Sequence, residues 1–406
     1  MSWRKENVIE RLRTIFNDYG WDIGTEFYDT LEDEDKPSRS TLRRILGTKP
    51  WREIIKEVRD DTESTKEIGK DHLVRTVTQL QKKLSKQQNV NQLIIDTVMA
   101  SLSKISFRPS RIPPSEKKPG NLSFHALRSD DQVGEVVDSD FTQGIGNYNI
   151  KVFQERLDRW TEKMCLFREQ DKKSLGLNKL SLYFLGDHVE GETIYHGQAF
   201  FIDLHVMDQL MFAAEANINS ILTLAGVFPE IEIFCVQGNH GRAGKKGDHH
   251  PRTNFDNILY WFMQMALKDQ KNVKVYISKS PTMLVRNGEY NFALNHNDDV
   301  RGWMGIPFYG LARKEAKMNG LYGMTIHYNL GGHFHEPANI GDKIIVNGTM
   351  VGGSDLSINR MHISSEPCQK IFYFHPKNGI NRESNLKLDT RPILTTDDDG
   401  IFTAHD

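Results

Sequence analysis

The sequence predicts an α/β protein whose main domain is built on a parallel sheet. Three short apolar runs, typical of buried strands, begin at Leu122, Leu180 and Ile231. Apolar side chains at helical spacing fill the two intervals between these runs, from Ile150 to Met164 and from about Gln198 to Ala214. Strand, helix, strand, helix, strand is the order that a parallel sheet with crossover helices requires.

The composition limits the class of protein. A chain of 406 residues can hold two or three domains, and 38% hydrophobic with 26% charged residues is ordinary for a globular protein. A net charge of −2 excludes a uniformly basic nucleic-acid binder but allows a local basic patch. The three cysteines form no CxxC pair, which fits a reducing compartment and argues against a thiolate zinc site. With no signal-type apolar segment at the start and no run of membrane-spanning length, we expect a cytoplasmic protein without membrane contact.

The N-terminal region, residues 1–65, predicts a small helical domain. One amphipathic helix runs from about Trp3 to Tyr19, and a second, basic helix can be capped by Ser38 or Ser40 and ends at Gly47. Two short helices of which the second is basic suggest a DNA-binding helix-turn-helix. The alternative is a solvated basic helix in a small helical cap. The side chains that we predict as DNA contacts are Arg39, Arg43 and Arg44.

The stretch PSRSTLRRILGTKPW, residues 37–51, resembles the small repeats that accompany homing endonucleases. In those repeats a "PS…T…R.fG.W" pattern marks a DNA-contacting unit. The resemblance covers about 50 residues. It implies that the N-terminal region contacts DNA.

Residues 70–105 predict a coiled-coil-like helix. Apolar side chains recur at heptad-like spacing from Leu73 to Ile105, with Gln87 and Asn91 as a polar interruption, and we therefore expect a homo-oligomer. The alternative is an amphipathic helix packed on the main domain of its own chain. Three further segments follow. Residues 106–120 form a proline-rich linker, residues 121–390 form the main domain, and residues 391–406 form an acidic tail.

The C-terminal half of the main domain is rich in predicted strands. They include VKVYI, a hairpin that turns at Asn287–Gly288, and the runs ending near His333 and Gly348. Throughout the domain, polar side chains with metal-ligand chemistry follow the strands: Asp130, Gln132, Asp187, Asn239, His240, His296, His333 and His335. Ligands of open α/β sheets bind at the carboxyl ends of strands, so the joint occurrence predicts a metal centre there. A single histidine at a strand end is more often a hydrogen-bonded surface group.

These residues resemble the calcineurin-like metallophosphoesterases, which carry a D-x-H, GD, GNH, H and GHxH series in that order. The resemblance covers about residues 121–360 and implies a two-sheet sandwich flanked by helices that binds two divalent metal ions. It assigns one metal to Asp130, Gln132, Asp187 and His335. It assigns the other metal to Asp187 as the bridging ligand, Asn239, His296 and His333. His240 would face the leaving-group oxygen as the catalytic acid.

The chemistry justifies these residue types. Two divalent cations about 4 Å apart can bind the oxygens of a phosphate diester, turn a bridging water into hydroxide and stabilise in-line displacement. Carboxylate, amide and imidazole donors without thiolate suit Mn as the first expectation, with Mg, Fe or Zn as alternatives. Three residues depart from the family pattern. Gln132 replaces a histidine, Glu190 replaces an aspartate, and Gly241 replaces an acid, so His240 must be oriented from elsewhere, for instance by Asp248.

The substrate is predicted from the regions around the site. The plan resembles the DNA-repair exonuclease branch, and we expect a DNA nuclease, either exo- or endonuclease, whose substrate contacts are Arg242, Lys245, Lys246 and Arg252. A second hypothesis is a phosphomonoesterase acting on a phosphoprotein or a nucleotide, with the N-terminal region as a targeting module. The third is a non-catalytic DNA-binding or scaffold protein.

Overall fold

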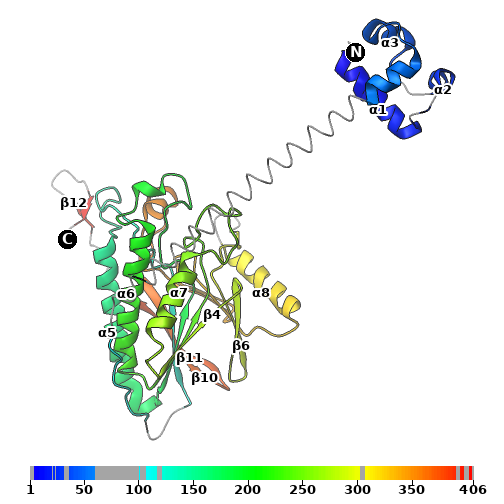
Figure 1. The fold of residues 1–406 in the computed structure, drawn as a ribbon. Coiled ribbons are helices and arrows are strands. Elements are labelled where there is room, and N and C mark those ends of the chain that lie inside the picture. The colour runs from blue at the N-terminus through cyan, green and yellow to red at the C-terminus, as the bar shows by residue number, and fades with distance from the viewer. Residues whose placement is uncertain are drawn as a thin grey trace. The chain divides into compact units, whose positions relative to one another are not determined.

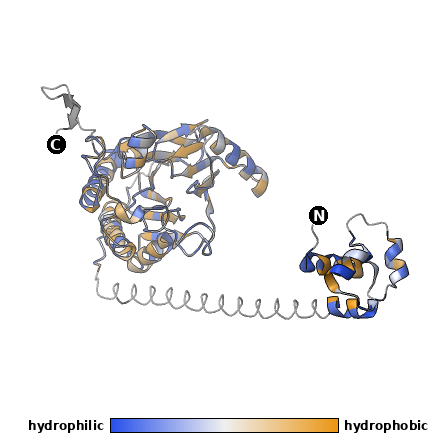
Figure 2. Cartoon of the chain, turned by 90° about the horizontal axis from the view of Figure 1, so that it is seen from above, coloured by the Kyte–Doolittle hydropathy of each residue, from blue (hydrophilic) through white to orange (hydrophobic). Residues whose placement is uncertain are grey.

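The computed structural model describes residues 4–20, 22, 24–31, 36–59, 100, 107–116, 121–301, 307–389, 394–396 and 402–404. The chain divides into two compact units, residues 1–104 and 105–406. In both units hydrophobic and hydrophilic residues alternate along the helices, as expected of helices with one buried face (Figure 2). The predicted coiled-coil segment falls almost wholly outside the described residues. No helix in the described ranges is long and apolar enough to cross a bilayer.

The first unit is a small bundle of short helices. Its elements are α1 (Lys5–Tyr19), α2 (Thr25–Thr30), α3 (Arg39–Leu46) and a helical stretch over residues 51–59. Its core contains Val8, Leu12, Ile15, Phe16, Tyr28, Leu42, Leu46, Ile54 and Val58.

The predicted ends of the first-unit helices are confirmed. The Ser38 hydroxyl accepts the Thr41 N–H at 3.2 Å, so Ser38 rather than Ser40 caps α3. Gly20 and Gly47 end α1 and α3, and each donates its N–H to a carbonyl of the last turn.

The first sheet of the second unit contains the predicted parallel strands. Its order is β11-β10-β1-β2-β3-β4, and neighbours from β1 to β4 run parallel. Two strands that the sequence pattern did not predict, β10 and β11, extend it on the β1 side in antiparallel pairing and make the sheet mixed. The strands are β1 (Ser123–Arg128), β2 (Lys179–Phe184), β3 (Glu230–Cys235), β4 (Val273–Ile277), β10 (Cys368–His375) and β11 (Gly379–Lys387).

Three helices cover one face of this sheet: α5 (Ile150–Leu175), α6 (Val206–Ala225) and α7 (Phe255–Ala266) (Figure 1). The expected cap of α7 is confirmed, because the Asn254 side chain accepts the Asp256 N–H. The predicted start of the second helix at Gln198 is wrong, since α6 begins eight residues later. Gln198 lies in a short 3-10 turn, where its buried carboxamide binds Glu190 and holds the segment as a loop.

The second sheet has the order β5-β6-β7-β9-β8 and is also mixed. Its first two strands form the predicted hairpin, and α8 (Phe308–Tyr322) lies beside the sheet (Figure 1). The strands are β5 (Thr282–Asn287), β6 (Tyr290–Asn295), β7 (Tyr328–Gly331), β8 (Ala338–Ile340) and β9 (Ile344–Val346).

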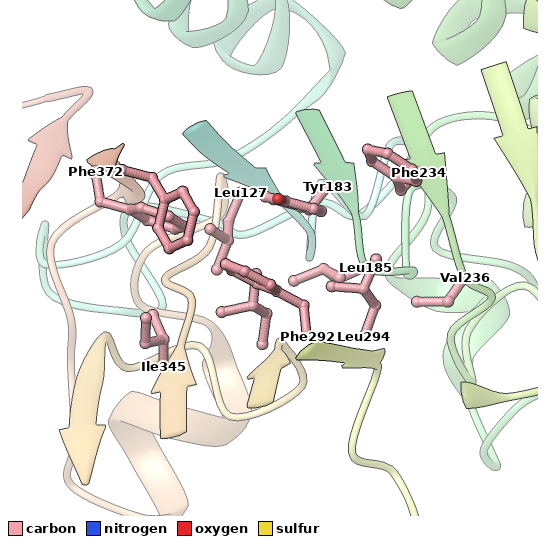
Figure 3. Close-up of a cluster of buried hydrophobic side chains, with 11 residues drawn as sticks. Leu127, Tyr183, Leu185, Phe234, Val236, Phe292, Leu294, Ile345 and Phe372 are labelled. Atoms are coloured by element: carbon pink, nitrogen blue, oxygen red, sulfur yellow. The ribbon is translucent and has the colours of Figure 1, made fainter. Parts of the chain in front are cut away.

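An apolar core joins the two sheets. Leu127, Tyr183 and Phe234 enter it from the first sheet, and Phe292 and Leu294 enter it from the second (Figure 3). Burying these side chains fixes one sheet against the other, which brings the ends of strands from both sheets to one place.

The flanking segments differ from simple linkers and tails. In the proline-rich stretch, described residues 107–116 form no helix or strand, but Ser110 donates from its N–H to Gln270 at 2.7 Å and from its hydroxyl to the Leu222 carbonyl at 2.6 Å. Near the C-terminus, β12 (Leu394–Thr396) and β13 (Phe402–Ala404) pair as a short antiparallel ribbon, which the acidic composition did not predict.

Candidate metal centre

Side chains from the ends of three strands converge at one point. Potential ligand atoms of Asp187, His296 and His333, which follow β2, β6 and β7, all lie within 4.8 Å of one another. The loops that carry them approach backbone to backbone. A Cβ on Gly238 would lie 2.1 Å from Asp187 Oδ1, and a Cβ on Gly186 would lie 2.3 Å from the Gly238 nitrogen. Only glycine fits at either position, which explains the glycines of the GD and GNH motifs.

The loop after β1 brings the other predicted ligands to the same place. The Gln132 N–H donates to the Asp187 carbonyl at 2.9 Å, which ties this loop to the loop after β2. The Asp130 carboxylate accepts the His333 N–H at 3.0 and 3.1 Å, and its Oδ1 lies 3.4 Å from His335 Nε2. Residues from both predicted metal sets are therefore neighbours.

Four predicted ligand atoms are buried and make no hydrogen bond within the described residues. These atoms are Gln132 Oε1, Asp187 Oδ2, Asn239 Oδ1 and His296 Nε2. Leaving Gln132 Oε1 and Asn239 Oδ1 unsatisfied costs about 1–3 kcal/mol each, so a native site supplies a partner. His296 Nε2 and Asp187 Oδ2 lie only 2.7 Å apart.

The hydrogen bond of His296 Nδ1 indicates that the missing partner is a metal ion. His296 Nδ1 donates to the Leu185 carbonyl at 2.7 Å, so Nε2 faces Asp187. Burial lowers the pKa of His296, but the charge of Asp187 reverses this effect and raises it to about 10. A ring nitrogen fixed in this way by a backbone carbonyl is typical of a metal-binding histidine. The donor set fits a divalent cation, and Asp187, His296 and His333 are the residues that would hold it.

The backbone at these residues is held in an uncommon conformation. Five predicted ligands have φ between 42° and 78°: Asp130, Gln132, Asp187, His333 and His335. Non-glycine residues rarely occupy this region, and they do so mostly where a site requires a particular side-chain direction. Structural stability alone does not account for five such residues at one point.

The charges around the centre favour metal binding. Burial raises the pKa of Asp187, but the nearby His296 and His240 more than offset this and hold it well below its usual range. Burial, together with the positive charge of His296, lowers the pKa of His333 to about 4. Asp187 is therefore an anion at neutral pH, and His333 is a neutral imidazole with a lone pair to share.

His240 lies beside the centre and is positioned by Glu190. Its backbone N–H donates to Asp187 Oδ1 at 2.7 Å, and its Nδ1 lies 2.9 Å from Glu190 Oε2. Burial lowers the pKa of His240, but Glu190 and Asp187 reverse this effect and raise it well above its usual value. The ring is therefore a protonated donor. The expectation that Asp248 orients His240 is wrong, because Asp248 accepts the Lys245 N–H in an exposed loop.

Gly241 and Glu190, two residues at which the sequence departs from the motifs that it resembles, have linked roles in the structure. A Cβ on Gly241 would lie 2.4 Å from Asn254 Oδ1, the capping atom of α7, so no acid can follow His240 in this chain. Glu190 supplies the carboxylate instead. Its Oε1 accepts Gln198 Nε2 at 2.7 Å and the Tyr195 hydroxyl at 3.2 Å, which fixes the carboxylate against His240.

Two buried carboxylates that support the centre were not predicted. Asp256 accepts the N–H groups of Asp187, His188 and Gly238 at 2.8–3.0 Å and so holds the loops after β2 and β3 together. Asp131 lies 2.8 Å from Arg128 and 2.7 Å from His188 Nδ1. The available signal for Asp256 is its position two residues after the helix cap Asn254. The sequence gives no separate signal for Asp131, because Asp130 is the adjacent residue and has the same side chain. Only the local backbone decides which of the two carboxylates faces the centre.

A cavity of about 340 Å³ opens from the centre at Gly238 and His296. Three of the four predicted substrate contacts line it, namely Arg242, Lys245 and Lys246. The fourth, Arg252, is exposed and is not among the described residues that line the cavity. Lys314 of α8 also lines it and was not predicted, because its place depends on packing between distant elements.

No protein-family model matches the chain, and no curated protein matches it either. The chemistry of the centre is therefore inferred from its donor atoms, their burial and the charges around them.

Replacing Gln132 by histidine is expected to tighten binding of the metal on the Asp130 side. The amide offers only a carbonyl oxygen, whereas an imidazole nitrogen binds Zn and similar metals more strongly. Histidine also tolerates the positive φ of 42° at this position. Calorimetric titration of both proteins with Mn²⁺ and Zn²⁺ should show tighter binding at one site and a shift towards Zn. Identical affinities and metal preference would mean that Gln132 is not a ligand.

Proposed function

We propose that this chain is a dinuclear-metal phosphoesterase of the calcineurin-like type that hydrolyses phosphodiester bonds in DNA. The observation that carries the proposal is the convergence of ligand atoms of Asp187, His296 and His333 within 4.8 Å, beside a histidine that a buried carboxylate positions. The two facing sheets with flanking helices are compatible with the two-sheet sandwich that this resemblance implies.

Each group of the site has a chemical role in this proposal. Bound divalent cations would supply Lewis acidity and an activated water for attack on phosphorus. His240 donates a proton to the departing oxygen, since its raised pKa keeps it charged at neutral pH. Glu190 holds the ring by Nδ1, and Nε2, which lies 3.4 Å from the Gln132 side chain, would donate to the departing oxygen. Asp187 fixes the backbone of His240 through its Oδ1, while its Oδ2, which lies 2.7 Å from His296 Nε2, would bind a metal.

The cavity favours an extended anionic substrate. Arg242, Lys245, Lys246 and Lys314 line it together with two carboxylates. Asp298 lies 3.9 Å from Lys246 and Asp299 lies 2.5 Å from Lys314, which leaves a net positive lining. Lys314 is held by Asn295, Asn297 and Asp299. These cations lie next to the metal centre. A second phosphate of a DNA chain could bind them, whereas a small monoester is too short to reach them.

A substrate panel with Mn²⁺ tests the proposal. Single-stranded DNA, double-stranded DNA, RNA, an aryl phosphodiester and an aryl phosphomonoester are compared with the full-length chain. We expect hydrolysis of DNA and of the aryl diester, and much slower hydrolysis of the monoester. Turnover of the monoester alone would overturn the nuclease assignment in favour of a phosphomonoesterase. No hydrolysis of any substrate would contradict the enzyme assignment.

The first unit is expected to add DNA affinity through Arg43 and Arg44. Both side chains are exposed and make no ion pair within the described part of the unit, whereas Arg39 is bound to Asp29 at 2.7 and 3.0 Å. Replacing Arg43 and Arg44 by alanine should weaken binding to all DNA sequences and lower the salt slope by up to about 2, since each phosphate contact contributes about 0.9. Fluorescence anisotropy over a salt series measures both quantities.

Arg39→Ala is the matched control for that measurement. Its effect should be smaller, because its guanidinium is already paired within the unit. Unchanged affinity and salt slope in the Arg43→Ala/Arg44→Ala double variant would exclude this surface as a DNA contact.

A further inference from the structure

The segment between Glu190 and α6 exposes three aromatic side chains within seven residues. Tyr195 is 45% exposed, Phe200 is 88% exposed and Phe201 is 42% exposed. We call these three residues the aromatic ledge. Single exposed apolar side chains need no explanation, but a cluster beside a candidate active site indicates binding.

Hydrogen bonds fix the aromatic ledge to the site. The Tyr195 hydroxyl lies 3.2 Å from Glu190 Oε1, and the Tyr195 ring centre lies 6.4 Å from that of His240. Gln198 anchors the middle of the segment to the Glu190 carbonyl and carboxylate at 2.8 and 2.7 Å. At its far end the Phe201 carbonyl accepts the Val136 N–H at 2.8 Å. The ledge is therefore adjacent to the group that faces the leaving oxygen.

The cationic cavity and the aromatic ledge are separate surfaces next to the centre. The cavity opens from the ends of β3 and β6, and the described residues that line it include no member of the ledge. The ledge lies beyond His240, on the loop that follows β2. A ligand bound at the centre thus has both the cation-lined cavity and the aromatic ledge within its surroundings.

Single-stranded nucleic acid has the chemistry that matches both surfaces. Its backbone carries regularly spaced negative charges, and its unpaired bases offer flat faces for stacking on aromatic side chains. In a duplex the base faces are already stacked on one another. An anionic peptide has the charge but lacks regularly placed rings.

We propose that the centre acts on a single-stranded stretch of DNA whose base on the leaving-group side stacks on Tyr195, with Phe200 and Phe201 continuing the stacking surface. The inference rests on the proposed function and specifies its substrate. Tyr195 is then a specificity-determining residue that recognises bases without reading their sequence.

The test compares two single strands of equal length and charge, an oligothymidylate and an abasic strand, with Mn²⁺ and the full-length chain. The ratio of their kcat/KM values measures recognition of the base apart from recognition of phosphate. We expect the wild-type chain to prefer the oligothymidylate, and Tyr195→Ala to reduce that preference roughly tenfold, the size of one lost base–aromatic stack. Tyr195→Phe should retain it, because the ring stacks and the hydroxyl does not.

Two further variants complete the design. Phe200→Ala should reduce the preference in the same direction, and its high exposure means that the change does not disturb packing. Tyr276→Ala on β4 is the matched control, since Tyr276 is 39% exposed and its ring stacks on Phe234 rather than on the centre. It should leave the preference unchanged.

The outcomes separate this inference from the proposed function. If Tyr195→Ala lowers kcat/KM equally for both strands, Tyr195 acts only through Glu190 and the stacking inference is wrong. If both Phe200→Ala and Tyr195→Ala keep the wild-type preference for the oligothymidylate, the stacking inference is also wrong. If Tyr195→Ala does not fold, the result for Phe200→Ala alone tests the inference. In either case continued hydrolysis of an aryl diester leaves the phosphoesterase assignment standing. Failure of the wild-type chain on the diester and both strands would overturn both.

Discussion

Asp187→Ala is expected to abolish hydrolysis and to remove at least one bound metal. Asp187 Oδ2 is buried, lacks a hydrogen bond within the described residues and lies 2.7 Å from His296 Nε2. It is the carboxylate that the resemblance places between both ions, so its loss removes a ligand from each. Turnover of an aryl diester and metal content by mass spectrometry measure the effect.

Two variants control for folding. Alanine at the Asp187 φ of 58° costs about 1–2 kcal/mol of backbone strain, whereas asparagine tolerates this conformation. Asp187→Asn should therefore stay folded, keep the hydrogen bond from the His240 N–H and still lose activity. Asp269→Ala, which removes an exposed carboxylate after α7, should behave as wild type. Full metal content and turnover in Asp187→Asn would contradict the bridging role.

His240→Ala is expected to slow turnover by about 10²–10⁴-fold, the usual range for loss of a general acid, while metal content stays nearly intact. The imidazole is held at Nδ1 by Glu190 and lies 3.4 Å from the side-chain nitrogen of Gln132 at Nε2, while its backbone N–H contacts Asp187. The backbone contact survives the substitution, so the metal ligands keep their positions.

A histidine outside the centre, His205, provides the control variant for His240→Ala. His205→Ala removes a ring that is 88% exposed before α6, and it should change neither turnover nor metal content. Loss of the metals in His240→Ala would show that this histidine is a ligand, and the assigned role would be wrong.

Much of the fold was predictable because its elements are locally encoded. Apolar periodicity located the helices and the parallel strands. The caps Ser38 and Asn254 located the starts of α3 and α7, and the structure agrees with both. The start of α6 was not predictable in this way, because Gln198 leaves the helix pattern to bind Glu190 in the tertiary structure. The antiparallel pairing of β10 with β1 joins segments more than 200 residues apart, and no local pattern specifies such a pairing.

The candidate centre divides in the same way. Its ligands were predictable because each follows a strand, and strand ends of a parallel sheet meet at one edge. The groups that support these ligands were not predictable, because they contact residues that are distant in the sequence. Glu190 reaches His240 from the loop after β2, and Asp256 reaches three N–H groups from the first turn of α7.

The most direct test of the central claim is anomalous scattering from crystals of the full-length chain grown with Mn²⁺. The account predicts one manganese peak in contact with Asp187, His296 and His333, and a second in contact with Asp130, Gln132 and His335. If no peak lies within ligand distance of Asp187 Oδ2 at saturating Mn²⁺, the centre is not a metal site and the phosphoesterase assignment is contradicted.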